Sequence, residues 1–198
     1  YIADGGGGLQ VALFDTHLEL VRSDKLALLF GILFHLATFL ACLYAFHLKD
    51  RMQQVAALIY AGGALGAVFA GDLITLFVAW EIMAVSSVFL IWARRTPRAS
   101  AAGLRYLMMQ ISSGLLLLAG ALLHISETGS PAFGPMGLGS LAGILIFTAF
   151  GIKCAFPLVH SWLTDAYPEA TPTGMVFLSA FTTKVAVYGL ARGYAGTE

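Results

Sequence analysis

Apolar residues dominate six stretches of this chain, and each stretch is about as long as a helix needs to cross a bilayer, roughly 20 residues. Polar or glycine-containing segments separate them. This pattern predicts an all-α, polytopic transmembrane helix bundle of about six helices, in a membrane domain covering residues 26–194. Residues 1–25, which are richer in charge and glycine, are predicted to be an extramembrane segment. The six predicted helices are residues 26–47, 54–70, 73–92, 104–124, 141–160 and 173–192.

The composition supports a membrane location. Hydrophobic residues make up 59% of the chain and charged residues 11%, with a mean hydropathy of +0.83. Soluble domains carry about 25% charged residues, so a lipid bilayer is the expected partner of this surface. The net charge is zero and no basic stripe is present, which argues against nucleic acid as a partner. The first residue is Tyr1, and we expect the chain to be part of a longer protein.

The positive residues predict an orientation. If the helices alternate in direction, one side of the membrane carries five of these residues and the other side three. The positive-inside rule then places the loop from Arg94 to Arg98 in the cytoplasm. The larger group comprises Lys49, Arg51, Arg94, Arg95 and Arg98, and the smaller group comprises Arg22, Lys25 and Arg192.

Three ionisable residues lie near the middle of predicted helices: Glu81, Lys153 and Lys184. A charge at the bilayer centre costs about 2.5–3.5 kcal/mol on insertion scales, so such residues are functional by default. Desolvation favours the neutral form of a lysine, and a nearby carboxylate favours the charged form. A lysine whose carboxylate partner approaches and withdraws is therefore a proton site that can be loaded and emptied. The alternative is a structural ion pair, although one acid cannot neutralise two lysines.

Pro157 predicts a broken helix beside Lys153. A proline has no N–H, so the carbonyl four residues earlier, that of Lys153, loses its helical donor. Irregular backbone at membrane depth occurs inside protein or beside a water-filled cavity, and transporters build ion sites from it. His160 follows Lys153 by seven residues and is a candidate proton relay, because histidine titrates near neutral pH. A continuous helix would put both residues on one face.

Weaker candidates lie elsewhere in the chain. His35 could bond a backbone carbonyl or carry protons, and His124 is expected at the membrane interface. Asp165 and Glu169 lie in a polar loop, where they could attract cations or simply be solvated. The sequence has no phosphate-binding glycine loop, metal-ligand spacing or nucleophile elbow. We therefore expect no catalytic residue, metal site or cofactor within this chain, and its status as part of an enzyme stays open.

Three motifs in order resemble the proton-antiporter-like membrane subunits of respiratory complex I, membrane-bound hydrogenases and Mrp-type cation/proton antiporters. They are GDLITLFVAWEIM at residues 71–83, GIKCAFPLVHSWLTDAYPEATPT at residues 151–173 and KVAVYGLAR at residues 184–192. The resemblance covers roughly residues 56–194 and is nearest to the D-type Mrp subunit or its complex I equivalent.

The resemblance implies roles for individual residues. Glu81 would be the acid that gates the lysine, Lys153 the proton-loading lysine, and Lys184 the lysine that passes the proton onward. Arg105 lies where the family often has a basic residue. The family is built from two inverted repeats, of which this chain would supply about one.

The predicted function is that of a proton-translocating subunit in a Mrp-like cation/proton antiporter, in a bacterial cytoplasmic membrane. The alternative parent complex is an NADH:quinone oxidoreductase or a membrane-bound hydrogenase. The expected partners are homologous antiporter-like subunits, the lipid bilayer and protons, with sodium left open. Two other hypotheses remain, a structural scaffold whose charges only hold helices together and a subunit that binds quinone.

Overall fold

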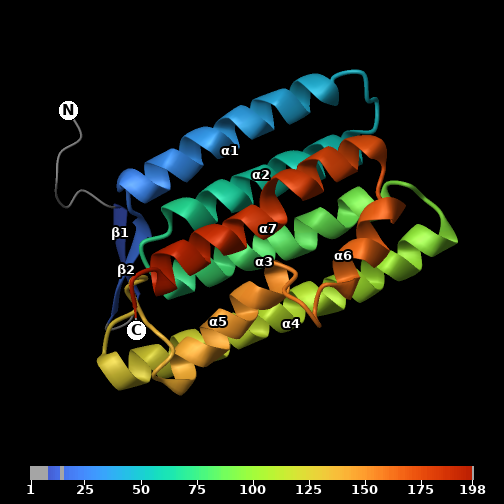
Figure 1. Cartoon of the computed structure of the whole chain (residues 1–198). Coiled ribbons are helices and arrows are strands. Elements are labelled where there is room, and N and C mark those ends of the chain that lie inside the picture. The colour runs from blue at the N-terminus through green and yellow to red at the C-terminus, as the bar shows by residue number, and fades with distance from the viewer. Residues whose placement is uncertain (1–8, 14–15, 198) are drawn as a thin grey trace.

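The protein is a bundle of long helices, described by a computed structural model over residues 9–13 and 16–197 (Figure 1). Five of its helices are long and apolar enough to cross a membrane. The bounds of the helices are α1 Lys25–Tyr44, α2 Arg51–Phe69, α3 Leu73–Trp92, α4 Pro97–Thr128, α5 Leu141–Lys153, α6 Ser161–Ala166 and α7 Pro172–Tyr194, with a short 3-10 helix, η1, at Tyr167–Glu169. The prediction of a polytopic helical membrane bundle is confirmed.

Short polar side chains fix where most of these helices begin. Each accepts a hydrogen bond from a backbone N–H in the first helical turn, which would otherwise lack a partner. Thr96 caps α4, and Pro97 follows it at a position where a missing N–H costs nothing. This cap explains why α4 starts seven residues before the apolar run that predicted it. The other side-chain caps are Asp24, Asp50, Asp72, Ser140 and Thr171.

A two-stranded antiparallel hairpin precedes α1, and the sequence had predicted only an extramembrane segment there. Its strands are β1, Leu9–Leu13, and β2, Thr16–Val21. The hairpin is tied to the turn between α2 and α3. The backbone N–H of Gly71 donates to the backbone carbonyl of Glu19 (3.0 Å), and the backbone N–H of Arg22 donates to the backbone carbonyl of Phe69 (2.7 Å). The hairpin therefore lies at the same end of the bundle as this turn (Figure 1).

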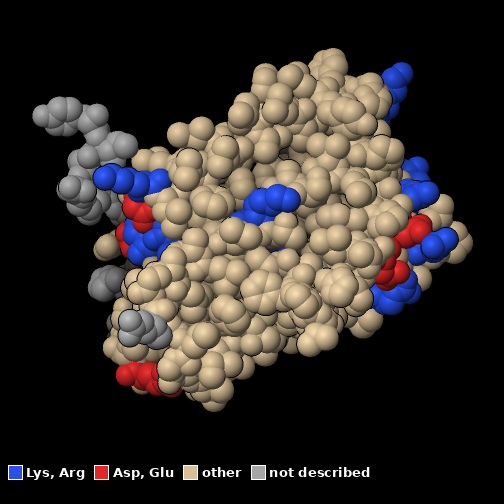
Figure 2. Space-filling view, viewed as in Figure 1, with Lys and Arg blue, Asp and Glu red and all other residues tan. Residues whose placement is uncertain are grey.

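Charged side chains gather at the two ends of the bundle, and the broad belt between them shows a single basic patch on this face (Figure 2). At the end opposite the hairpin, Arg95 bonds Asp50 (3.0 Å), which joins the α3–α4 connection to the start of α2. This grouping agrees with the predicted division of the positive residues between two sides. The belt is the part of the surface that suits lipid.

A cluster of charged side chains lies at the end of the bundle that carries the hairpin. The Arg192 guanidinium donates to both carboxylate oxygens of Asp24 (2.8 and 2.7 Å), and Arg22 donates to the carbonyl of Phe133 (2.5 Å). Burial raises the pKa of the Asp24 carboxyl. The N–H of Ala27 and the two arginines lower it by more, so that this pKa lies below its ordinary value. The cluster joins the start of α1 to the end of α7.

Candidate functional site: a buried lysine at a helix break

Lys153 is the last residue of α5, and its side chain is fully buried, with 1% of its surface exposed. Its Nζ donates a hydrogen bond to the backbone carbonyl of Trp80 (3.3 Å) on α3. The same nitrogen lies 4.1 Å from the centroid of the Trp80 ring, within range of a cation–π interaction. The ammonium is therefore held by a carbonyl and an aromatic face of one residue.

The helix breaks directly after Lys153, as Pro157 predicts. Ala155 (φ 58°) and Leu158 (φ 79°) adopt left-handed backbone conformations, which are rare for residues other than glycine. The indole of Trp162, on α6, donates to the carbonyl of Ile152 (2.9 Å) and so replaces a lost helical bond. The Ile152 carbonyl thus keeps a protein donor at the point where the helix ends.

A hydrogen-bonded frame holds the surroundings of Lys153. The Trp80 indole donates to the Ser113 hydroxyl (3.1 Å) on α4, and that hydroxyl donates to the carbonyl of Ala149 (2.7 Å) on α5. Ala149 lies one turn before Lys153. The Trp80 ring also packs against Phe150, with ring centroids 5.3 Å apart. Three helices therefore meet around the buried lysine.

Glu81 lies beside this frame, and its carboxylate faces Gly114 on α4. A Cβ atom added at Gly114 would overlap the Glu81 Oε1 atom, so the glycine makes room for the carboxylate. That buried oxygen has no hydrogen-bond partner among the described residues. Within the same residues, no ion pair joins Glu81 to Lys153. The lysine nevertheless bonds the carbonyl of the peptide that links Trp80 to Glu81.

Replacing Gly114 with alanine should displace the Glu81 carboxylate and slow proton movement by about tenfold, since small misplacements of reacting groups cost that much or more. The matched control is Gly62→Ala on α2, where an added Cβ meets nothing within 4 Å. Both changes gain about 0.8–1.0 kcal/mol of helix propensity. Proton transport by the full-length protein in vesicles is the measurement. Equal rates in the two variants would contradict this role of Gly114.

Lys184 and His160 lie apart from the buried frame. Lys184 is exposed on α7, and its Nζ donates to the carbonyl of Ser179 (2.7 Å). The basic patch within the belt lies over α7 (Figure 2). His160 is exposed just before α6. Because α5 ends at Lys153, the continuous helix that would put Lys153 and His160 on one face does not form.

The acidic loop candidates are engaged in ion pairs with the start of α4. Arg105 binds Asp165 through two hydrogen bonds (2.7 and 2.9 Å). Glu169 is largely buried and pairs with Arg98 (2.8 Å), with Arg94 4.0 Å away. These contacts fasten α6 and η1 to α4. The structure thus places Asp165 and Glu169 in ion pairs with arginines.

The two weaker histidine candidates, His35 and His124, lie outside the frame. His35 is exposed on α1, and its Nδ1 lies 2.7 Å from the carbonyl of Gly31. Of the two alternatives for His35, a bond to a backbone carbonyl or a role in carrying protons, the structure shows the backbone bond. His124 is half-buried near the end of α4.

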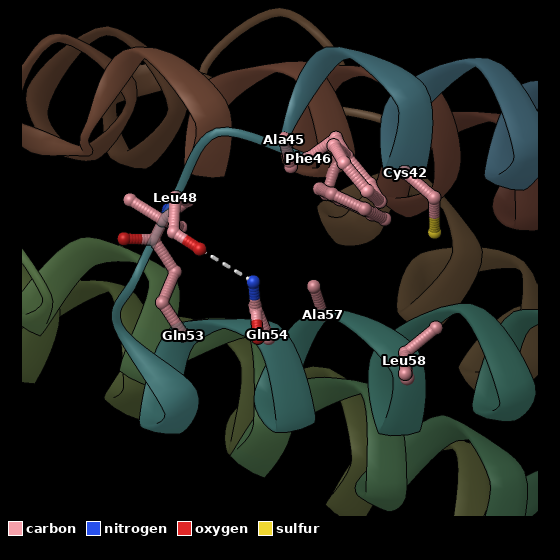
Figure 3. A pocket seen from close by; sticks show the side chains of 9 residues that line it. Cys42, Ala45, Phe46, Leu48, Gln53, Gln54, Ala57 and Leu58 are labelled. Carbon is pink, nitrogen blue, oxygen red and sulfur yellow. Dashed lines mark hydrogen bonds between the residues drawn. The ribbon is translucent and has the colours of Figure 1, made fainter.

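Several hollows lie at the surface of the part of the chain that the structure describes. A groove of about 780 Å³ between α2 and α3 is bordered by Glu81 and, on both helices, by apolar side chains such as Val55 and Phe89. A smaller pocket of about 230 Å³ lies between the end of α1 and the start of α2 (Figure 3). In it the Gln54 amide donates to the carbonyl of Leu48 (2.6 Å). None of the proton-path candidates borders this pocket.

Sequence reasoning missed three residues that build the site: Trp80, Ser113 and Gly114. Ser113 carried a signal, since it is a polar residue inside the apolar run that predicted α4. Trp80 and Gly114 carried none, because an aromatic residue or a glycine in an apolar helix is ordinary. The roles of Trp80 and Gly114 depend on which side chains of the neighbouring helices they contact.

The fold and this site define a polytopic helical membrane protein with a buried lysine at a helix break. The chain belongs to the family described as NADH:quinone oxidoreductase/Mrp antiporter, TM, whose profile matches residues 70–195. NADH-quinone oxidoreductase subunit M of Escherichia coli K12 is 30% identical over 190 residues, covering 85% of this chain and 37% of the relative. Subunit N of Deinococcus radiodurans is 29% identical, covering 89% of this chain and 39% of the relative.

Solved structures share the fold. A chain of the Mrp complex from Dietzia sp. DQ12-45-1b matches with a TM-score of 0.74 and 28% identity, covering 86% of this chain and 34% of that chain. A chain of respiratory complex I from Thermus thermophilus matches with a TM-score of 0.79, and its 23% identity supports the fold alone. The chain spans only about a third of the length of the proteins it matches.

Proposed function

We propose that this chain is the proton-translocating part of an antiporter-like subunit in a larger membrane complex of the Mrp type. Protons would move through Glu81, Lys153, His160 and Lys184. The observation that carries the proposal is the state of Lys153, which is fully buried, bonds a backbone carbonyl and ends a helix at a break. Intramembrane ionisable residues of this kind mark ion and proton pathways.

The arrangement supports a loading and release cycle. Burial favours the neutral form of a lysine, while an adjacent carboxylate favours the charged form. Glu81 lies one residue from the carbonyl that Lys153 binds, and one of its oxygens has no partner among the described residues. A small movement of this carboxylate would therefore change the proton affinity of the ammonium.

The next steps would run through exposed residues. Lys184 and His160 are both exposed on this chain. In a protein of the length of its relatives, further helices would cover Lys184 and continue the path. His160 would connect Lys153 with the side of the membrane that carries Arg94 to Arg98, which we propose to be the cytoplasm. The membrane would be a bacterial cytoplasmic membrane.

A second parent complex is supported by the relatives. Several of the curated proteins that match are NADH-quinone or NAD(P)H-quinone oxidoreductase chains, whereas one matching structure is an Mrp complex. In either case the proposed partners are homologous antiporter-like subunits. Sodium exchange would then reside elsewhere in the complex, since a bare cation prefers several oxygen ligands.

The test is proton movement by the full-length protein within its complex, reconstituted in vesicles that contain a pH-sensitive dye. We expect internal pH to change when a sodium gradient or membrane potential is applied, and a protonophore to abolish that change. An NADH-driven change would assign the protein to the oxidoreductase alternative. An intact complex that moves no protons under any of these driving forces would contradict the proposal.

A further inference from the structure

Gln110 carries a side-chain amide that is fully buried. It lies on α4, and none of its side chain is exposed. Neither its Nε2 nor its Oε1 has a hydrogen-bond partner among the described residues. Leaving such groups unpaired costs about 1–3 kcal/mol each, and buried polar groups without protein partners are commonly satisfied by bound water. An apolar residue would avoid this cost, so the amide requires an explanation.

Two contacts on either side locate the face of α4 that carries Gln110. One turn before it, the Tyr106 hydroxyl shares a hydrogen bond with Ser87 (2.9 Å) on α3. One turn after it, Ser113 is bonded to both Trp80 on α3 and Ala149 on α5. Side chains three and four positions apart share a helix face. Gln110 is therefore directed into the seam where α4 meets α3 and α5.

The same contacts set Gln110 at the level of Lys153. Helices α4 and α5 pack against each other and run in opposite directions. Ser113 is level with Ala149, so the residue one turn earlier on α4 is level with the residue one turn later on α5, which is Lys153. On the other side of Gln110, Gly114 faces the Glu81 carboxylate. Gln110 is thus level with the lysine on α5 and one helical turn from the glycine that faces the acid.

All three polar groups have hydrogen-bonding capacity that the described residues do not fill. Lys153 has three donors and makes one hydrogen bond, to Trp80. The Glu81 Oε1 atom is buried and unpartnered, as are both amide atoms of Gln110. An amide both donates and accepts, so it can bind water that links an acceptor to a donor. It does not titrate, so it cannot itself carry the proton.

We propose that Gln110 is a positioning residue that holds water between Glu81 and Lys153. The water forms an unbroken chain from the ammonium to the carboxylate, and the amide holds this chain from one side, its NH₂ group donating to one water and its carbonyl oxygen accepting from another. The proton passes between the two titratable groups through this water. This inference rests on the proposed function, because it supplies the link between two residues of the same path.

The test replaces Gln110 with methionine, which has similar length but no comparable hydrogen-bonding group, in the full-length complex. We expect proton transport in vesicles to fall about tenfold, equivalent to about 1.4 kcal/mol in the barrier. The melting temperature should stay the same or rise, because an unpaired amide is removed. Gln110→Asn, which keeps the amide, should restore part of the rate. The matched control is Gln54→Met at an exposed position on α2.

The outcomes separate this inference from the proposed function. If Lys153→Met abolishes transport but Gln110→Met leaves the rate unchanged, Gln110 has no positioning role and the proton path stands. A parallel loss of melting temperature and transport in Gln110→Met, with no rescue by Gln110→Asn, would mean that the amide serves packing only. If the unaltered complex moves no protons, the proposed function fails first. Combining Gln110→Met with Glu81→Gln should reduce the rate no further than the larger single effect.

Discussion

Lys153→Met should reduce proton transport by at least about tenfold while the complex still assembles. Methionine matches the length of the lysine stem but cannot hold a proton, and Lys153 is the one fully buried cation of the described residues. Replacing a buried charge with an apolar group of similar volume is often neutral or stabilising, because it removes a desolvation cost. We therefore expect the melting temperature of the purified complex to be unchanged or higher. Proton uptake into vesicles is the measurement.

The control for this variant is Lys49→Met, which changes the same residue type at an exposed position between α1 and α2. It should transport protons at the unaltered rate. A scaffold whose charges only hold helices together predicts a different result for Lys153→Met, either loss of assembly or no change at all. Normal assembly with normal transport would rule out Lys153 as a proton carrier.

Glu81→Gln should also slow proton transport by about tenfold or more, since an amide of the same shape cannot change the charge beside Lys153. The carboxylate lies in a space that Gly114 provides, and the amide fits this space without a change in volume. The fold should therefore be preserved. Transport should be slow in both directions, because loading and release of the lysine both depend on the carboxylate.

The matched control is Glu127→Gln, at an exposed position near the end of α4. It should leave transport unchanged. A Glu81→Gln variant that retains the full rate would show that the carboxylate does not regulate the lysine. A variant that moves protons normally but assembles poorly would instead point to a packing role for Glu81.

The approximate positions of the six long apolar helices could be read from the sequence, because apolar runs are local features. The predicted bounds were wrong for the fifth helix, which ends at Lys153 and not at residue 160, and the short helices α6 and η1 were not predicted. A run such as residues 73–92 must be helical in lipid, where no water can satisfy its backbone. The break after Lys153 was equally local, since Pro157 removes a donor that only the Lys153 carbonyl could use. The hairpin before α1 was not predicted, because its attachment depends on backbone bonds to the distant α2–α3 turn.

The sequence by itself determined that this is a helical membrane protein with ionisable residues at membrane depth, because the cost of placing charge in lipid depends on position along a helix. Only the tertiary structure decided which of these residues are enclosed. Lys153 is buried by Trp80 and the helix packing around it, whereas Lys184 is exposed on this chain. Whether a side chain points toward a neighbouring helix depends on packing between segments that lie far apart in the sequence. Local sequence patterns do not specify this packing.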